Sequence, residues 1–328
     1  MSVEVAVPLS SIGPRRAADL LCTGLVADGV DAVLVERPAG PRANVHLSNS
    51  SRGLLVPLAR RRGCLVTLHD VVPRDRRVRP FLQPVMRRVL DRHRVVVHSR
   101  HAADLLRAQG YDRPVGVVPL ALPVVAPAPQ ARGAAHDELR AGAAGPLLVL
   151  AGVLKAAKGV AEVVAAARDV PDARVLLVGR IADSSTAEAL AARPANVTVI
   201  ERADDAEFSR ILAAADAVLL PRSDSVGETS GPLVMAHALG TPVAMLDTGS
   251  APEYAGPDDL VAPASTTVAA LVAEAAGRAW PRGVAAPDEA VARVVRAYRR
   301  ELTALGWVDD GTTSPSRDRS IDETRRRR

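Results

Sequence analysis

Two series of short, valine-rich apolar runs, each run followed by an amphipathic stretch, constrain what this chain can fold into. In the first series we expect strands at Val3–Val7, Ala32–Val35, Val45–Leu47, Leu65–Leu68, Val95–Val97 and Val115–Val118. The stretches between them predict helices near Arg15–Ala27, Gly53–Arg62, Phe81–Asp91 and Ala102–Gln109. Strands that alternate with helices form a mostly parallel sheet, whose ligands bind beyond the carboxyl ends of the strands.

A proline-rich segment separates the two series. Between Pro119 and Gly145 the chain has prolines at 119, 123, 127 and 129 and is rich in Ala and Gly. Such a composition predicts an interdomain linker, with a short helical piece near Asp137–Ala141. We therefore assign a first Rossmann-like domain to residues 1–122 and a linker to residues 123–145.

The second series repeats the alternation. Strands are expected at Leu147–Ala151, Val175–Val178, Val197–Ile200, Ala217–Leu220, Val243–Leu246 and Leu260–Val261. Helices fit at Gly159–Ala167, Ser185–Ala192, Asp205–Ala215, Gly231–Leu239 and Thr266–Ala276. This pattern predicts a second Rossmann-like domain over residues 146–284, and so an α/β protein with a cleft between two domains. A last helix, Glu289–Leu305 within residues 285–307, either closes this domain or crosses back to the first. Residues 308–328 are expected to be disordered.

Composition narrows the function classes. Aromatic residues make up only 2% of the 328 residues, which disfavours a stacking platform for single-stranded nucleic acid, and we expect no nucleic-acid partner. Cys22 and Cys64 lie in apolar runs without metal or disulfide spacing, so we expect no metal site and a reducing, cytoplasmic location.

Positive charge is concentrated in the first half of the chain. Residues 1–130 contain 19 Arg against 10 Asp and Glu, a net charge of +9, and the remainder has a net charge of −4. The arginines that make the first domain's helices cationic are Arg60–Arg62, Arg74, Arg76, Arg77, Arg79, Arg87, Arg88 and Arg92. They indicate an anionic lipid surface, a phosphorylated acceptor or an ordinary solvated face. Peripheral contact with the inner face of the cell membrane is one of these alternatives.

The two lysines of the chain, Lys155 and Lys158, lie in one turn between Gly152 and Gly159. A buried strand is expected to end at Ala151 and a helix to begin at Gly159. Amide groups at a helix start favour an anion, and compact ammonium groups suit a phosphate at close range. The turn therefore predicts a diphosphate site, and the alternative is a solvated helix start.

A second helix start follows the strand Ala217–Leu220. Ser230 suits the N-cap, Pro232 the first turn and Gly240 the position after the last turn. The Ser230 and Gly231 amides are thus a second anion site. Glu228 beside them would accept hydrogen bonds from sugar hydroxyls, or would help to cap the helix.

The second half resembles the nucleotide-binding domain of family 4 retaining glycosyltransferases of the GT-B fold, over roughly residues 145–280. The matching segments are Gly152…Lys158-Gly159, Val178-Gly179, Asp216–Pro221, Gly240–Val243 and Gly249…Glu253. The resemblance and the two anion sites together imply donor-binding roles for Gly13, Gly152, Lys155, Lys158, Gly179, Arg180, Ser230, Gly231, Pro232 and Glu253.

The first domain is more loosely similar to the family. Thr67–Asp70 resembles the family's His-Asp at a strand end, where the histidine lies near the transferred sugar. Val96–Ser99 and Val117–Pro119 match common helix-start and linker-start segments. The resemblance implies His69 as a catalytic residue with Lys158 and Glu228, and Asp70 and Ser99 on the acceptor side.

Several family features are altered. The family carries a second glutamate, on the ribose, eight positions after the first, where this chain has Ala236, or Met235 if Gly-Thr-Pro is the anchor. The family's arginine after the first glycine is Val153, so Lys155 or Arg180 would supply that charge. The amino-terminal Gly-Gly loop is reduced to Ser10–Gly13. These changes fit a divergent branch or an inactive member.

The resemblance implies sugar transfer with retention from a nucleotide-diphosphate-sugar donor to a saccharide, lipid-linked or small-molecule acceptor. Fixed cations and amides would stabilise the departing diphosphate, so the donor is a co-substrate and neither metal nor cofactor is needed. The alternatives are a non-catalytic GT-B protein that binds a nucleotide sugar or a protein partner, and a sugar-nucleotide epimerase.

Overall fold

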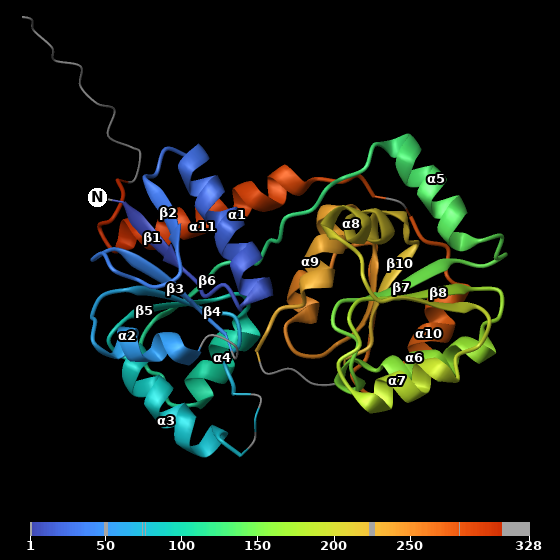
Figure 1. Cartoon of the computed structure of the whole chain (residues 1–328), viewed down its shortest axis with the longest axis horizontal. Helices are drawn as coiled ribbons and strands as arrows, with labels where there is room; N and C mark the ends of the chain where they lie inside the picture. Colours follow the sequence, from blue (N-terminus) through green and yellow to red (C-terminus); the bar gives the residue numbers. More distant parts are fainter. Residues whose placement is uncertain are drawn as a thin grey trace, which may run out of the picture.

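The chain folds into two α/β domains, each built on a six-stranded parallel sheet (Figure 1). The computed structural model describes residues 2–48, 52–73, 75, 77–222, 227–281 and 283–309. The prediction of two Rossmann-like domains with parallel sheets is confirmed.

The N-terminal sheet has the strand order β2-β1-β3-β4-β5-β6. Its strands are β1 (Val3–Ala6), β2 (Ala32–Val35), β3 (Ala43–Leu47), β4 (Leu65–Leu68), β5 (Arg94–Val97) and β6 (Val115–Val117). The helices are α1 (Ile12–Ala27), η1 (Arg52–Leu54), α2 (Leu55–Ala59), α3 (Arg79–Leu90) and α4 (Arg100–Ala108). All residues of β3 and β4 are buried, because helices cover both faces of the sheet, and the buried residues include the polar Asn44, His46 and Thr67.

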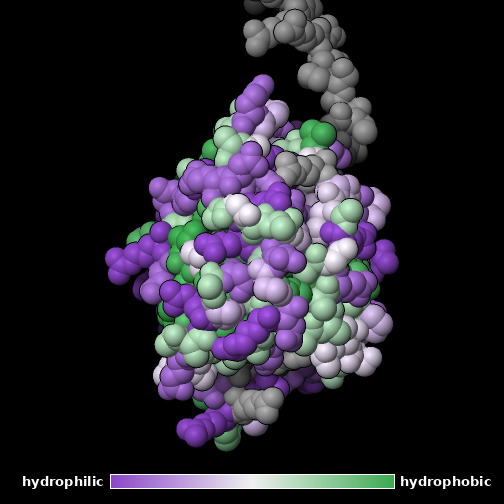
Figure 2. All heavy atoms as spheres, turned by 90° about the vertical axis from the view of Figure 1, so that its right-hand side faces the viewer, coloured by the Kyte–Doolittle hydropathy of each residue, from purple (hydrophilic) through white to green (hydrophobic). Residues whose placement is uncertain are grey.

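The C-terminal sheet has the order β12-β11-β10-β7-β8-β9. Its strands are β7 (Leu147–Ala151), β8 (Arg174–Val178), β9 (Val197–Ile200), β10 (Ala217–Leu220), β11 (Val243–Leu246) and β12 (Leu260–Ala262). The helical elements are η2 (Ala156–Lys158), α6 (Val160–Ala166), η3 (Ala167–Asp169), α7 (Ser184–Ala191), α8 (Asp205–Ala214), α9 (Gly231–Ala238), η4 (Ala251–Tyr254) and α10 (Val268–Gly277). Figure 2 views this end of the molecule, where hydrophilic and hydrophobic residues are interspersed as on an ordinary solvated surface.

The predicted linker contains a longer helix than we expected. The predicted helix near Asp137–Ala141 is too short, because α5 has twelve residues and runs from Pro129 to Arg140. Proline at the first helical position has the backbone angle of a helix and lacks only an amide that would be unpaired there, so Pro129 starts this helix and does not prevent it. Ala135 of α5 packs into the core of the C-terminal domain, and α5 lies against α8.

The last helix crosses back to the N-terminal domain, the second of the two predicted alternatives. Helix α11 (Pro287–Ala304) packs against α1, and Val294, Tyr298 and Leu302 are buried with Leu21 and Leu25. Figure 1 shows α11 beside α1. Of the predicted disordered tail, residues 310–328 lie outside the described part of the chain.

Candidate functional site

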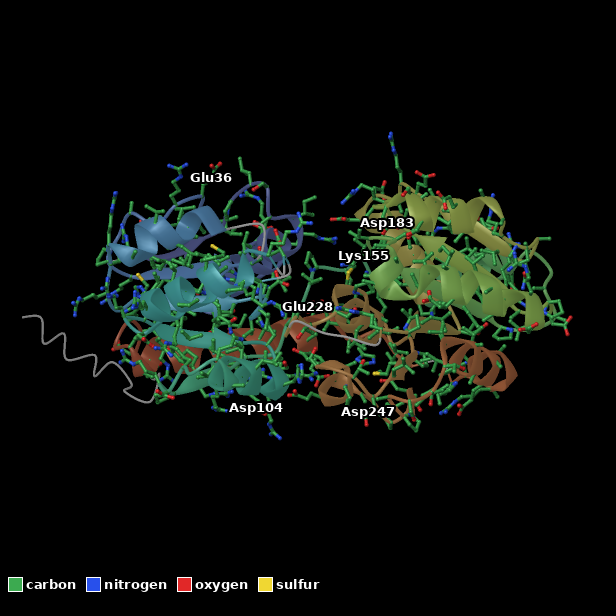
Figure 3. All side chains as sticks on the ribbon, turned by 90° about the horizontal axis from the view of Figure 1, so that it is seen from below. Glu36, Asp104, Lys155, Asp183, Glu228 and Asp247 are labelled. Carbon is green, nitrogen blue, oxygen red and sulfur yellow. The ribbon has the colours of Figure 1, made fainter. Side chains whose placement is uncertain are left out.

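A cavity of about 400 Å³ lies between the two domains, beyond the carboxyl ends of both sheets. It brings together five of the predicted site residues: Gly13, His69, Asp70, Glu228 and Gly231. In Figure 3 Glu228 lies between the two domains, and Lys155 lies on the side of the C-terminal domain that faces this gap. The predicted interdomain cleft is therefore present, and we call this cavity the cleft.

Two glycines shape the C-terminal wall of the cleft at the ends of β7 and β8. Gly152 has φ of +99° and Gly179 has φ of +135°, a region that side chains other than glycine rarely occupy. A Cβ on Gly179 would lie 1.9 Å from the Gly152 carbonyl oxygen. The two backbones can approach this closely only because both residues are glycine.

The turn that follows Gly152 presents the two lysines. Lys155 is the N-cap residue of η2, and Lys158 is its last residue, with Nζ donating to the Ala151 carbonyl at 3.3 Å. A Cβ on Gly152 would lie 2.7 Å from Lys158 Nζ and 3.3 Å from Pro232 Cγ. The Lys158 ammonium and the first turn of α9 are therefore neighbours, as the two-part anion site requires.

A carboxylate fixes this turn from the other side. Asp183 Oδ2 accepts from the Ala156 amide at 3.0 Å, while Oδ1 accepts from the Thr186 amide at 2.8 Å and from Ser185 Oγ. Hydrogen bonds to the charged form lower the pKa of Asp183, first from the Thr186 side chain and then from the Thr186 amide, the Ala156 amide and Ser185. Arg180, which the sequence assigns to the donor, is exposed.

Helix α9 starts as predicted, with Ser230 at the N-cap, Pro232 in the first turn and Gly240 at φ +69° after the end. Within the described residues the Ser230 hydroxyl makes no capping hydrogen bond. Glu228 accepts a hydrogen bond from Arg222, and both side chains are mostly buried. An arginine thus holds the carboxylate that the sequence assigns to the sugar.

Three histidines form a hydrogen-bonded chain on the N-terminal wall of the cleft. His69 Nε2 lies 2.9 Å from His46 Nδ1, and His69 Nδ1 lies 3.2 Å from His98 Nε2. At the outer ends of this chain, His98 Nδ1 lies 3.0 Å from the Val118 carbonyl oxygen and His46 Nε2 lies 3.3 Å from Asn44 Nδ2. His69 and His98 line the cleft, and His46 lies behind them, 1% exposed.

Burial keeps these imidazoles neutral. Desolvation lowers the pKa of His46 to about 3, with His98 adding to the effect, and lowers the pKa of His98 to about 4. Burial, and then the two neighbouring histidines, also lower the pKa of His69 well below its ordinary value.

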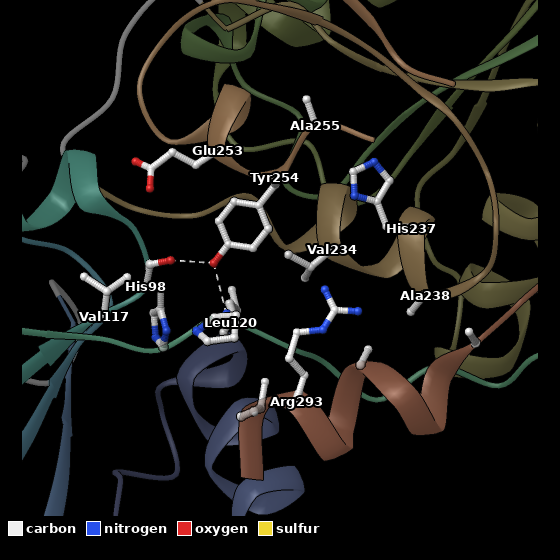
Figure 4. A pocket seen from close by; sticks show the side chains of 14 residues that line it. His98, Val117, Leu120, Val234, His237, Ala238, Glu253, Tyr254, Ala255 and Arg293 are labelled. Carbon is white, nitrogen blue, oxygen red and sulfur yellow. Dashed lines mark hydrogen bonds between the residues drawn. The ribbon is translucent and has the colours of Figure 1, made fainter. Parts of the chain in front are cut away.

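Two predicted site residues lie instead at a contact between the domains. Glu253 of η4 accepts from the amides of Arg100 and His101 at 2.6 Å each, and Ser99 Oγ accepts from the Ala102 amide at 3.0 Å. Both side chains therefore cap α4. Next to Glu253, the Tyr254 hydroxyl donates to the His98 carbonyl and accepts from the Leu120 amide (Figure 4). A second cavity of about 400 Å³ lies beyond this contact and shares His98 and Leu120 with the cleft.

Sequence reasoning missed His46, His98, Arg222 and Tyr254. The sequence contains a signal for His98: His69 and His98 each directly follow a mostly buried strand, and the register of β4 and β5 pairs Leu68 with Val97. The positions expected for the second family glutamate, Met235 and Ala236, are both core residues, 2% and 0% exposed.

In the part of the chain that the structure describes, no helix is both long and apolar enough to cross a membrane. The same residues include no group of three His, Cys, Asp or Glu side chains arranged to hold a metal ion.

Comparison with known sequences gives one match. Residues 145–278 match the family model of the glycosyl transferases group 1. No curated protein sequence matches significantly.

Several solved structures share the fold of the whole chain. Sucrose-phosphate synthase from Thermosynechococcus elongatus superposes with a TM-score of 0.70 at 15% identity, over 93% of this chain and 100% of that one. HepE of Anabaena, solved with UDP and glucose, gives 0.67 at 15% identity, over 94% and 100%. A glycosyltransferase from Rickettsia africae gives 0.62 at 14%, over 93% and 97%. The fold is therefore that of the GT-B proteins, and residues 145–278 are similar to the glycosyl transferases group 1.

Proposed function

We propose that this protein transfers a sugar from a nucleotide-diphosphate-sugar donor to an acceptor, with retention of the anomeric configuration and without a metal ion. The observation that carries the proposal is the approach of the Lys158 ammonium to the start of α9, on the same side of the cleft as Glu228. One ammonium group and the amides of one helix start, with Lys155 close by in the same turn, suit a diphosphate. The solved complexes of HepE contain UDP and UDP-glucose, which agrees with such a donor.

Each of these residues would have a separate role in the transfer. Departure of the diphosphate is the difficult step, because negative charge grows on the leaving group while the anomeric carbon becomes cationic. Lys158, Lys155 and the α9 amides are fixed in place before the reaction, so they stabilise that charge without reorganisation. Glu228, held by Arg222, would accept hydrogen bonds from sugar hydroxyls, and Asp70 would face the acceptor.

The test is release of nucleoside diphosphate. Purified protein is incubated with UDP- and GDP-sugars and with saccharide, lipid-linked and small-molecule acceptors. Acceptor-dependent release, with product of unchanged anomeric configuration by NMR and no loss of rate in EDTA, is the expected result. Absence of turnover over the whole panel would contradict the proposal.

A second candidate is a non-catalytic protein that binds a nucleotide sugar or a protein partner. The observation that favours it is that the positions expected for the ribose glutamate hold Met235 and Ala236, both buried in the core. Donor binding without turnover in the same assay would support this candidate.

We also propose peripheral contact with an anionic membrane, and with it a lipid-linked acceptor. On α3, Phe81 is 78% exposed and Val85 is 50% exposed, and Arg88 lies on the same helix. Exposed apolar side chains beside arginines suit an anionic lipid surface and, with it, a lipid-linked acceptor.

A further inference from the structure

The hydrogen positions in the histidine chain follow from the acceptor at one end. The Val118 carbonyl oxygen can only accept, so the Nδ1 of His98 must carry a hydrogen. In a neutral His98 the Nε2 then accepts, and His69 must donate to it from its own Nδ1. His69 Nε2 is left to accept from His46 Nδ1. All three rings thus have the same tautomer, with hydrogen on Nδ1.

The contacts at the other end of the chain agree with this direction. His46 Nε2 must accept, and the amide nitrogen of Asn44 is its donor at 3.3 Å. The amide oxygen of Asn44 then has to face a donor, and Thr67 Oγ1 donates to it at 2.8 Å. Thr67 Oγ1 in turn lies 3.0 Å from the Tyr298 hydroxyl, which can donate to it. No other tautomer of the three rings satisfies both ends.

An additional proton would disrupt this order. A histidine charged at both nitrogens would point one N–H at a neighbour's N–H and break a hydrogen bond in a buried site. Among the described residues, the other ionisable groups around the chain include Asp70 and Glu228 in the cleft, Tyr254 from η4 and Tyr298 from α11. The second cavity adds His237, Glu253 and Arg293 on the far side of His98. Glu228 is paired with Arg222. Burial lowers the pKa of all three histidines, in agreement with neutral rings.

We propose, resting on the transferase function above, that His46 and His98 are positioning residues that hold His69 in one neutral tautomer and one ring orientation. Both ring nitrogens of His69 are occupied within the protein. The peptide N–H of His69 donates to the Leu47 carbonyl at 2.8 Å. What His69 offers the sugar is therefore a fixed wall made of its ring carbons and its carbonyl group. It is neither the general base nor the acid of the reaction, and it does not bind the sugar through a ring nitrogen.

The tautomers are measurable by NMR in the full-length protein labelled with nitrogen-15. Long-range proton–nitrogen correlations distinguish hydrogen on Nδ1 from hydrogen on Nε2, and single histidine variants assign the signals. His93 is an internal reference of the opposite tautomer, because its Nδ1 accepts from the Cys64 amide and its Nε2 donates to the Leu58 carbonyl, both at 3.2 Å. His46, His69 and His98 are expected to have the Nδ1–H pattern at pH of about 7.5 and of about 5.5. A His69 with hydrogen on Nε2, or one that titrates in this range, overturns the proposal.

The positioning role is tested through His46, which does not line the cleft. His46→Leu removes the donor to His69, whereas His46→Asn keeps an amide N–H near the position of Nδ1. In His46→Leu we expect His69 to lose its single tautomer and kcat to fall about tenfold, with KM for the donor nearly unchanged. His46→Asn should restore the tautomer and most of kcat.

The matched control is His93→Leu, which removes a buried histidine of the same domain, 3% exposed, outside the chain. It should leave the tautomer of His69 and kcat unchanged. Equal losses of kcat in His46→Leu and His93→Leu, with the His69 tautomer intact in both, would overturn the positioning role. If the wild-type protein turns over no donor, the transferase function fails, and the NMR measurement alone still decides whether His46 and His98 fix the His69 ring.

Discussion

The two walls of the cleft are built in different ways. On the C-terminal wall, the anion site has two parts, the turn from Gly152 to Lys158 and the start of α9, and each part is formed by residues that are close in the sequence. On the N-terminal wall, the ordering of His69 depends on residues from three strands and on Tyr298, which is 231 residues from its partner Thr67. The first wall consists of two local motifs with positive charge, and the second is a long-range network of neutral groups.

This difference matches the tasks proposed for the two walls. A diphosphate needs fixed cations and amides, which a turn and a helix start supply locally. A sugar ring needs a wall of defined shape, and a buried hydrogen-bonded network provides rigidity without adding charge. The comparison predicts that substitutions in the turn act on donor binding or on folding, and that changes at the histidines act on geometry and on pH dependence.

The largest effect is expected at the close approach of the two glycine backbones. Gly179→Ala would place a Cβ 1.9 Å from the Gly152 carbonyl oxygen at φ +135°, and should cost about 4 kcal/mol or more of the free energy of unfolding. Urea unfolding measures the loss. The matched control is Gly133→Ala in α5, where nothing lies within 4 Å and stability should rise by about 0.5–1 kcal/mol. Similar stability of the Gly179→Ala variant and the wild type would show that the turn does not need the close approach.

The N-terminal network should make stability depend on pH. The pKa of His46 in the folded protein, about 3, is below the ordinary value of 6.5, so the unfolded chain binds more protons between these values. Stability is therefore complete above about pH 6.5 and falls as the pH decreases, by about 1.4 kcal/mol per pH unit for each histidine of this kind. Urea unfolding of the wild type and of His46→Asn between about pH 7 and 5 should show a shallower slope in the variant. Parallel slopes would contradict neutral burial of His46.

The smallest effect is expected at Glu253, which the sequence places with the donor and the structure places at the start of α4. Glu253→Ala should cost about 1 kcal/mol of stability through loss of the cap, with the donor Kd unchanged. Glu274→Ala, an exposed glutamate on α10, is the control for loss of a charge. If the donor Kd rises about tenfold in Glu253→Ala and not in Glu274→Ala, Glu253 contributes to donor binding, which contradicts a purely capping role.

Most of the fold could be predicted from the sequence because its strands are buried on both faces. The bounds of β2, β4, β7, β9, β10 and β11 agree with the predicted ones to the residue. The extent of α5 was wrong because Pro129 and the surrounding Ala and Gly resemble a linker, and only packing on α8 shows that the segment is helical.

Only the parts of the candidate site that are local in the sequence could be predicted. Lys158 and the start of α9 were recognisable, because each is defined by its neighbours in the sequence. His46 could not be identified, since its importance arises only when the register of β3 and β4 places it beside Thr67 and behind His69. His98 required the pairing of β4 with β5.

The measurement that tests the account most directly is calorimetric titration of UDP and GDP into the wild type, Lys158→Ala and a control, Arg168→Ala, an exposed arginine of η3 on the same domain. We predict that one of the two nucleotides binds the wild type and Arg168→Ala with the same Kd, and that Lys158→Ala raises this Kd about tenfold or more. Equal Kd values in all three proteins, or no binding of either nucleotide to the wild type, would contradict a diphosphate site at the Lys158 turn.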